Sequence, residues 1–167
     1  NRFVAQRAGI ESSWSGVDVQ LQRRHDLIPN LVRAVRAHAV SERDVLEQVS
    51  HARAAAVAAD RDPATSPAEQ ARHEGTLTVA THDLLAVAEG YPQLRAAADF
   101  QRLHAQLVET EDRIAAARRL YNLEVRALNR RVEAFPSNLV ASAFGIRRAD
   151  YFQLSDAGPA VPPTVNV

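Results

Sequence analysis

The chain has 167 residues, and its 20 basic residues balance 20 acidic ones, so its formal net charge is zero. This length suits a single domain with one core. A neutral chain has no overall field that draws it onto nucleic acid, so no nucleic-acid partner is predicted. Every basic residue is arginine, and cysteine is absent, which excludes disulfides, thiolate chemistry and cysteine-based zinc sites.

The composition favours helices over strands. Aromatic residues make up 5% of the chain, there are 6 glycines and alanine is abundant. No run approaches the ~20 apolar residues that a membrane-spanning helix needs. We therefore predict an all-α domain over residues 1–152, an antiparallel up-and-down bundle of four helices, followed by an extended, proline-containing tail over residues 153–167.

The N-terminal third allows two interpretations. Apolar residues seven apart, from Trp14 to Val35, continue one helical stripe through Pro29, which favours a single kinked helix. However, proline inside a helix costs about 3 kcal/mol, and Asp26 could cap a new helix. Matching of helix lengths favours the break. We predict helices over about 2–25, 26–57, 67–89 and 100–135. The alternative is three long helices, the first kinked at Pro29, plus a short C-terminal helix.

The helix at 67–89 has the clearest boundaries. Ser66 can cap it, and Glu69 three residues later completes a capping box. Pro67 suits the first turn, where a missing N–H has no cost. Gly90 is predicted to end the helix in the left-handed conformation.

Steps of three or four residues between apolar positions predict the long helix at 100–135, with Asp99 as its N-cap and Pro136 at its end. Residues 134–146 then contain no charged residue. Ser137 can cap a short helix in this stretch. That helix either docks on the end of the bundle, or enters a membrane interface or a partner's groove.

The patterns of catalytic and metal sites do not occur. Di-iron bundles use Glu-x-x-His pairs, whereas pairs such as Glu47 and His51 are four residues apart. Phosphate-binding loops and nucleophile elbows are absent from the sequence. Glu109, Glu111 and Asp112 are interpreted as a solvated helix face. We predict no catalytic, cofactor-binding or metal-binding residue, no cofactor and no enzyme activity.

One polar cluster, Arg23-Arg24-His25-Asp26, keeps two interpretations. It is either a structural joint, in which the arginines pair with nearby acids, or a docking surface. The candidate contacts to a partner or a membrane are Arg23, Arg24, Leu139, Val140 and Phe144.

Two strings of residues carry a family resemblance. The stretch WSGVDVQLQRRHDLIPNLV, from Trp14 to Val32, and the stretch FPSNLVASAFG, from Phe135 to Gly145, resemble the LemA family of bacterial membrane-anchored proteins. The resemblance implies one transmembrane helix just before the segment that begins here, and hence a single-pass protein of the cell membrane. The face of the membrane cannot be read, because the flanking charges of the anchor are not in this sequence.

The resemblance and the residues together lead to three hypotheses. The first is a noncatalytic, membrane-tethered helical scaffold or protein-interaction domain of the bacterial envelope, with envelope proteins as its partners and a homo-oligomer left open. The second is a membrane-remodelling or lipid-contacting module that acts through the uncharged C-terminal stretch. The third is a metal-binding or enzymatic bundle.

Overall fold

The computed structural model describes residues 2–39 and 41–154. It is all-α, as predicted, and these residues form six helices and no strand. The helices are α1 (Arg2–Arg36), α2 (Arg43–Arg61), α3 (Pro67–Glu89), α4 (Pro92–Ala96), α5 (Ala98–Glu133) and α6 (Ser137–Ala143). None of the described helices is both long and apolar enough to cross a membrane. Most of the predicted tail, residues 155–167, lies outside the described residues.

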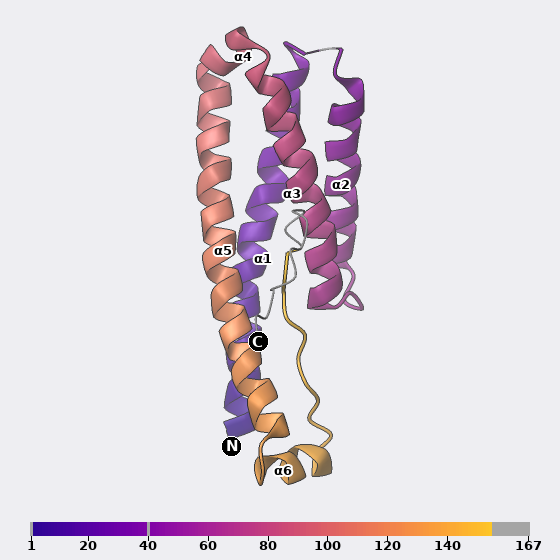
Figure 1. The fold of residues 1–167 in the computed structure, drawn as a ribbon, viewed down its shortest axis with the longest axis vertical. Coiled ribbons are helices and arrows are strands. Elements are labelled where there is room, and N and C mark those ends of the chain that lie inside the picture. The colour runs from indigo at the N-terminus through magenta and orange to yellow at the C-terminus, as the bar shows by residue number, and fades with distance from the viewer. Residues whose placement is uncertain (1, 40, 155–167) are drawn as a thin grey trace, which may run out of the picture.

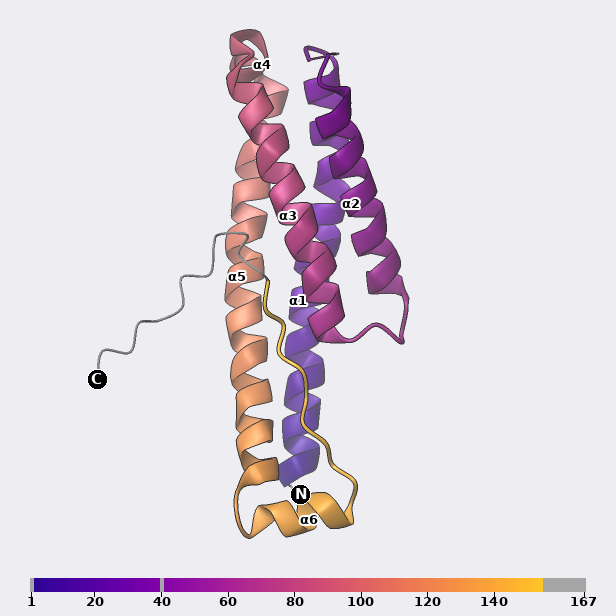
Figure 2. The same cartoon turned by 45° about the vertical axis from the view of Figure 1, so that its right-hand side comes forward.

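Helices α1 and α5 run antiparallel, side by side, along the length of the molecule (Figure 1). The antiparallel pair α2 and α3 covers one half of them, so only that half contains four helices (Figure 2). The short α4 makes the turn between α3 and α5 at this four-helix end. At the opposite end α6 lies across the tips of α1 and α5, close to the first residues of α1. We call this the α6 end, formed by residues 2–8 and 126–148.

The half of the α1–α5 pair without α2 and α3 is covered by an extended segment, residues 146–154, which we call the strap (Figure 2). Its Phe152 is fully buried. The ring of Trp14 packs edge-on against both Phe152 and Tyr121, with centroid separations of 5.4 and 5.1 Å. The strap thus replaces the missing helix pair as the third side of the core.

Two asparagines of α5 bind the strap through paired hydrogen bonds. Asn129 donates to the Ala149 carbonyl at 3.0 Å and accepts from its N–H at 2.8 Å. Asn122 makes the same two bonds with Phe152, both at 3.0 Å. Seven residues of helix rise ~10.5 Å, and three residues of extended chain span ~10 Å. The two periodicities match, so both asparagine amides meet the strap in register.

The predicted break near His25 is wrong, because α1 continues through Pro29 for 35 residues in all. Proline has no N–H, so the His25 carbonyl loses its intrahelical donor. In its place Arg53 of α2 donates from Nε to the His25 carbonyl at 2.6 Å. Asp26 is an exposed residue of the helix interior and not an N-cap. A side chain from the neighbouring helix therefore removes part of the cost of the proline.

The chain turns later than predicted, between Arg36 and Arg43. The alternative is right that the first helix continues through Pro29, but that helix ends at Arg36, and α2 is a separate helix. Four helices have 19 or more residues, namely α1, α2, α3 and α5. The length-matching argument failed because α1 and α5 do extend beyond α2 and α3, and the strap and α6 cover the overhang.

Helix α3 has the predicted bounds at both ends, but only its start has the predicted cap geometry. The Ser66 side chain accepts a hydrogen bond from the Glu69 N–H at 3.2 Å, as the capping box predicts. Gly90 instead has φ of −73°, a right-handed conformation, because the chain continues directly into α4. The left-handed glycine is Gly145, with φ of 63°, after α6.

Two predicted caps near α5 and α6 are also wrong. Ala97 precedes the first turn of α5, and Asp99 lies inside that turn. Ser137 does not cap α6. Its hydroxyl donates to the carbonyls of Arg131 and Ala134 at 2.7 and 2.9 Å, and so ties α6 to the end of α5.

Candidate functional site

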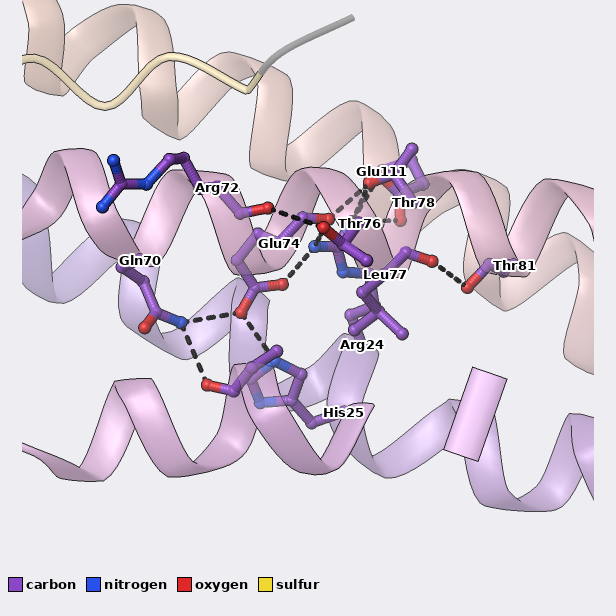
Figure 3. A network of polar contacts seen from close by, with 11 residues as sticks. Arg24, His25, Gln70, Arg72, Glu74, Thr76, Leu77, Thr78, Thr81 and Glu111 are labelled. Carbon is purple, nitrogen blue, oxygen red and sulfur yellow. Dashed lines mark hydrogen bonds and ion pairs between the residues drawn. The ribbon is translucent and has the colours of Figure 1, made fainter. Parts of the chain in front are cut away.

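Arg24 and Glu74 form the centre of a polar network inside the four-helix half (Figure 3). Arg24 comes from α1 and Glu74 from α3, and both side chains are 0% exposed. Arg24 Nη2 donates to Glu74 Oε2 and, at 3.2 Å, to the Glu74 carbonyl. Ionised side chains are rarely buried to this extent unless they are paired.

Arg24 has a second carboxylate partner on α5. Its Nη1 donates to both oxygens of Glu111, at 3.0 and 3.2 Å, and to Thr78 Oγ1 at 2.9 Å. Interpreting Glu111 as part of a solvated patch was therefore wrong, although its neighbours Glu109 and Asp112 are exposed. One guanidinium group thus connects α1 to both α3 and α5.

The second oxygen of Glu74 is also occupied. Oε1 accepts from Gln70 Nε2 at 2.8 Å and lies 2.7 Å from His25 Nε2. Because an ionised carboxylate only accepts, Nε2 of His25 is the protonated nitrogen in this contact. Gln70 also donates to the Ala56 carbonyl of α2 at 3.3 Å. The network therefore joins all four long helices.

The electrostatic environment keeps Glu74 ionised. Burial alone raises its pKa, but the hydrogen bond from His25 and the positive charge of Arg24 outweigh burial, so the pKa lies below its ordinary value. Burial lowers the pKa of Arg24, and the charges of Glu74 and Glu111 raise it further than burial lowers it. Arg24 and Glu74 therefore stabilise each other in their charged forms.

A second pair of acids lies between α1 and α2. Partial burial, together with a hydrogen bond and charge repulsion from Asp18, raises the pKa of Asp60 to about 6. Two carboxyl groups that share a site cannot both ionise freely at low cost. Asp60 therefore binds a proton more readily than an isolated aspartate does.

The arrangement around Glu74 favours a structural role over a chemical one. Both Glu74 oxygens and both terminal nitrogens of Arg24 already bind protein groups, and neither side chain reaches solvent. A substrate would have to displace these contacts to react. Within residues 2–39 and 41–154, no group of three or more His, Asp or Glu side chains could hold a metal ion.

The sequence cluster at residues 23–26 separates into two environments. Arg24 is inaccessible in the folded bundle, so it cannot serve as a surface contact. Arg23 is partly exposed and pairs with Glu109 at 3.5 Å, and Glu109 also accepts from Arg113 at 2.6 Å. The structural interpretation of the cluster fits Arg24, and Arg23 is the arginine of the pair that retains an accessible side chain.

The sequence predictions missed Gln70 and Glu74 as members of a site. The available signal was their position. Both belong to the buried face of α3, together with Ala71, Leu77 and Leu84. A glutamate on an apolar helical stripe indicates a buried cationic partner, but the partner's identity depends on the packing of α1.

The predicted apolar contacts on α6 are exposed. Leu139 is 61% exposed, Val140 46% and Phe144 77%, and the neighbouring Phe135 is 79% exposed. The helix packs inward through Ala141, which belongs to a small core cluster with Phe3 and Leu128. These four large apolar side chains therefore point away from the core.

The fold and the network define a helical-bundle protein in which a buried polar network links the four long helices. The chain belongs to the LemA family, whose family model matches residues 13–166, and the resemblance read from the sequence is confirmed. It is 30% identical over 186 residues to magnetosome proteins MamQ 1 and MamQ 2 of Paramagnetospirillum magneticum, covering 98% of this chain and 68% of each relative. It is 27% identical to magnetosome protein MamQ of Magnetospirillum gryphiswaldense, covering 99% of this chain and 69% of the relative. The family and these relatives indicate a membrane-associated, noncatalytic protein.

Proposed function

We propose that this protein is a noncatalytic, membrane-tethered helical scaffold of the bacterial envelope that holds partner proteins. Membership of the LemA family supports the tether, and the MamQ relatives are named as magnetosome proteins. An assembly role at a membrane is consistent with both.

The observation that carries the proposal is that the buried charged groups bind other side chains and backbone groups of the protein itself. Arg24 binds Glu74 and Glu111 across three helices, and His25 and Gln70 contact the remaining oxygen of Glu74. Such a network fixes how the helices pack, and it leaves none of its central groups available for a reaction.

The shape of the molecule suits a spacer. With 36 residues, α5 is ~54 Å long, and α1 runs beside it from the α6 end to the four-helix end (Figure 2). A tether placed before α1 would hold the α6 end near the membrane. The four-helix end would then stand tens of ångströms away, where it could meet protein partners.

In-cell crosslinking of the full-length anchored protein tests this proposal. A photocrosslinking amino acid is placed at Val79 or Val108, two exposed positions of the four-helix half, and adducts are identified by mass spectrometry. We expect discrete protein adducts at these positions. A buried position, Leu77, serves as the control that should give none. Absence of any protein adduct from the exposed positions would contradict the scaffold.

Elemental analysis tests the enzymatic alternative separately. Protein purified without chelator is expected to contain no stoichiometric transition metal. A metal present at one ion per chain would favour a metalloprotein and overturn the proposal.

A further inference from the structure

The α6 end combines an exposed apolar surface with a fixed backbone. Phe135, Leu139, Val140 and Phe144 are exposed, and the whole stretch from residue 134 to 146 has no charged side chain. Soluble surfaces rarely gather large apolar groups in this way unless something binds them.

The α6 helix is held firmly in the orientation that exposes these groups. Ala141 is 1% exposed and packs against Phe3 and Leu128. The Ile146 N–H donates to the Ala141 carbonyl at 2.8 Å, and the Ser137 hydroxyl donates to two carbonyls at the end of α5. Because α6 docks through Ala141, its larger apolar neighbours Leu139, Val140 and Phe144 remain exposed.

The same end is strongly basic. Residues 2–8 and 126–148 contain seven arginines and a single acid, Glu133, in a chain whose net charge is zero. Glu133 pairs with Arg148 at 3.0 Å. Among the described residues, the ion pairs give no acidic partner to the other arginines of this end, which are Arg2, Arg7, Arg126, Arg130, Arg131 and Arg147.

An anionic lipid surface matches this chemistry. Basic side chains near a bilayer are attracted to acidic headgroups, and exposed Phe and Leu side chains enter the boundary between headgroups and acyl chains. Helix α6 lies at the tip of the molecule, away from α2 and α3 (Figure 2). A tether before α1 would approach the bilayer at this same end.

We propose that the α6 end is a membrane-docking surface, in which the arginines bind anionic lipid headgroups while Phe135, Leu139 and Phe144 enter the bilayer interface. This goes beyond the scaffold function, because the contact does not require the tether. The long axis of the molecule would then point outward from the membrane surface, and the four-helix end would remain accessible to protein partners.

Vesicle flotation with the 167-residue chain tests the docking surface. The probes are vesicles of phosphatidylcholine alone and vesicles that also contain phosphatidylglycerol. We expect the chain to float with the anionic vesicles, less with the neutral ones, and less again as salt is raised. Failure of the chain to bind anionic vesicles at low salt would overturn the proposal.

Two variants separate the apolar and the charged contributions. The double variant L139S/F144S and the double variant R130Q/R147Q are each expected to bind anionic vesicles roughly tenfold more weakly. The matched control V108S/L120S removes two exposed apolar groups of α5 and is expected to bind like the original chain. Circular dichroism checks that all variants are folded.

The outcomes distinguish this proposal from the scaffold. Equal flotation of L139S/F144S and the original chain would overturn the docking surface and leave the crosslinking result at Val79 and Val108 unaffected. A protein adduct from a crosslinker at Phe144, without vesicle binding, would assign the α6 end to a protein partner and also overturn it. Loss of flotation in both test variants, with the control unchanged, would establish lipid contact.

Discussion

Arg24 of α1 donates to the carboxylate of Glu74 on α3 at a point where neither side chain is exposed to solvent. A charged pair at the centre of a helical bundle does not by itself add stability, since removing two ions from water costs several kcal/mol for each. The pair instead makes each residue depend on the other, because either charge buried without its partner would destabilise the fold. Arg24 connects α1 to α3 through Glu74 and to α5 through Glu111, so loss of one partner would leave a buried charge without its full set of contacts.

Replacing Glu74 by glutamine is expected to destabilise the fold severely. The substitution keeps the volume of the side chain but removes the negative charge opposite Arg24, whose remaining carboxylate, Glu111, is partly exposed. We expect the free energy of unfolding to fall by about 3 to 5 kcal/mol, measured by urea denaturation. The control, Glu109→Gln, removes an exposed charge and is expected to cost about 0.5 kcal/mol or less. Equal effects of the two substitutions would contradict the role of Glu74.

Removing both charges is expected to cost much less than removing one. Arg24 Nε has no hydrogen-bond partner among the described residues, so the network does not recover the full cost of burying the guanidinium. A double variant, R24M/E74L, leaves neither charge unpaired. We expect R24M and E74L each to lower the free energy of unfolding by about 3 to 5 kcal/mol. The double variant should regain a few kcal/mol of the summed loss. A double-mutant cycle with additive losses would show that the two residues act independently.

The acid pair between α1 and α2 predicts a dependence of stability on pH. The pKa of Asp60 in the folded state is about 6, above the ordinary value, so the folded chain binds the proton more tightly than the unfolded chain. The stability linked to this proton is present at low pH and is lost as the pH rises through about 6. Asp60→Asn removes the repulsion from Asp18. We expect it to stabilise the fold at neutral pH by about 1 kcal/mol, a value reduced for the partial exposure of the pair.

The advantage of Asp60→Asn is expected to disappear on acidification. Well below its ordinary pKa of 3.8, Asp60 is protonated in both states and resembles asparagine. The check is urea denaturation of both proteins across this range, with Asp112→Asn, an exposed acid of α5, as the control. A constant difference between Asp60→Asn and the original chain at every pH would refute the assignment.

Glu74 makes the stability of the fold change with pH in the opposite direction to Asp60. Its pKa is below the ordinary value, after burial is outweighed by His25 and Arg24, so the unfolded chain binds this proton more tightly. The stability that Glu74 provides is present above the unfolded pKa and is lost as the pH falls through the folded one. The original chain should therefore show steeper acid unfolding than R24M/E74L, in which this carboxylate is absent. Identical acid unfolding of the two proteins would count against this assignment.

The sequence was sufficient for features set by local patterns. The all-α class follows from apolar periodicity, α3 has the bounds that Ser66 and its capping box predict, and α5 differs from its predicted range by two residues at each end. The short uncharged stretch also marked Phe144 as a candidate surface contact, and Phe144 is exposed. The two strings of residues that resemble the LemA family identified the family but gave no information about how the helices pack.

Features set by packing between distant segments could not be read from the sequence. Glu74 lies 50 residues from Arg24, and nothing in either local sequence specifies the other. The strap is held by Asn122 and Asn129, whose role depends on an extended partner that returns along α5. The path of α1 through Pro29 is the clearest case, since the compensating donor, Arg53, lies on a different helix.

The contact between Arg53 and the His25 carbonyl leads to a prediction about Pro29 itself. If Arg53 replaces the hydrogen bond that proline cannot make, then Arg53→Ala should cost about 1 to 3 kcal/mol, as expected for a partly buried bond with a charged donor. Pro29→Ala restores a backbone N–H four residues after His25. In that background the carbonyl has an intrahelical donor, so Arg53→Ala should cost about 1 kcal/mol less.

Urea denaturation of the four proteins of this cycle measures the coupling. Arg61→Ala, an exposed arginine of the same helix, is expected to have the same small effect in both backgrounds. An Arg53→Ala cost that is unchanged by Pro29→Ala would mean that Arg53 stabilises α2 against α1 for a reason unrelated to the proline.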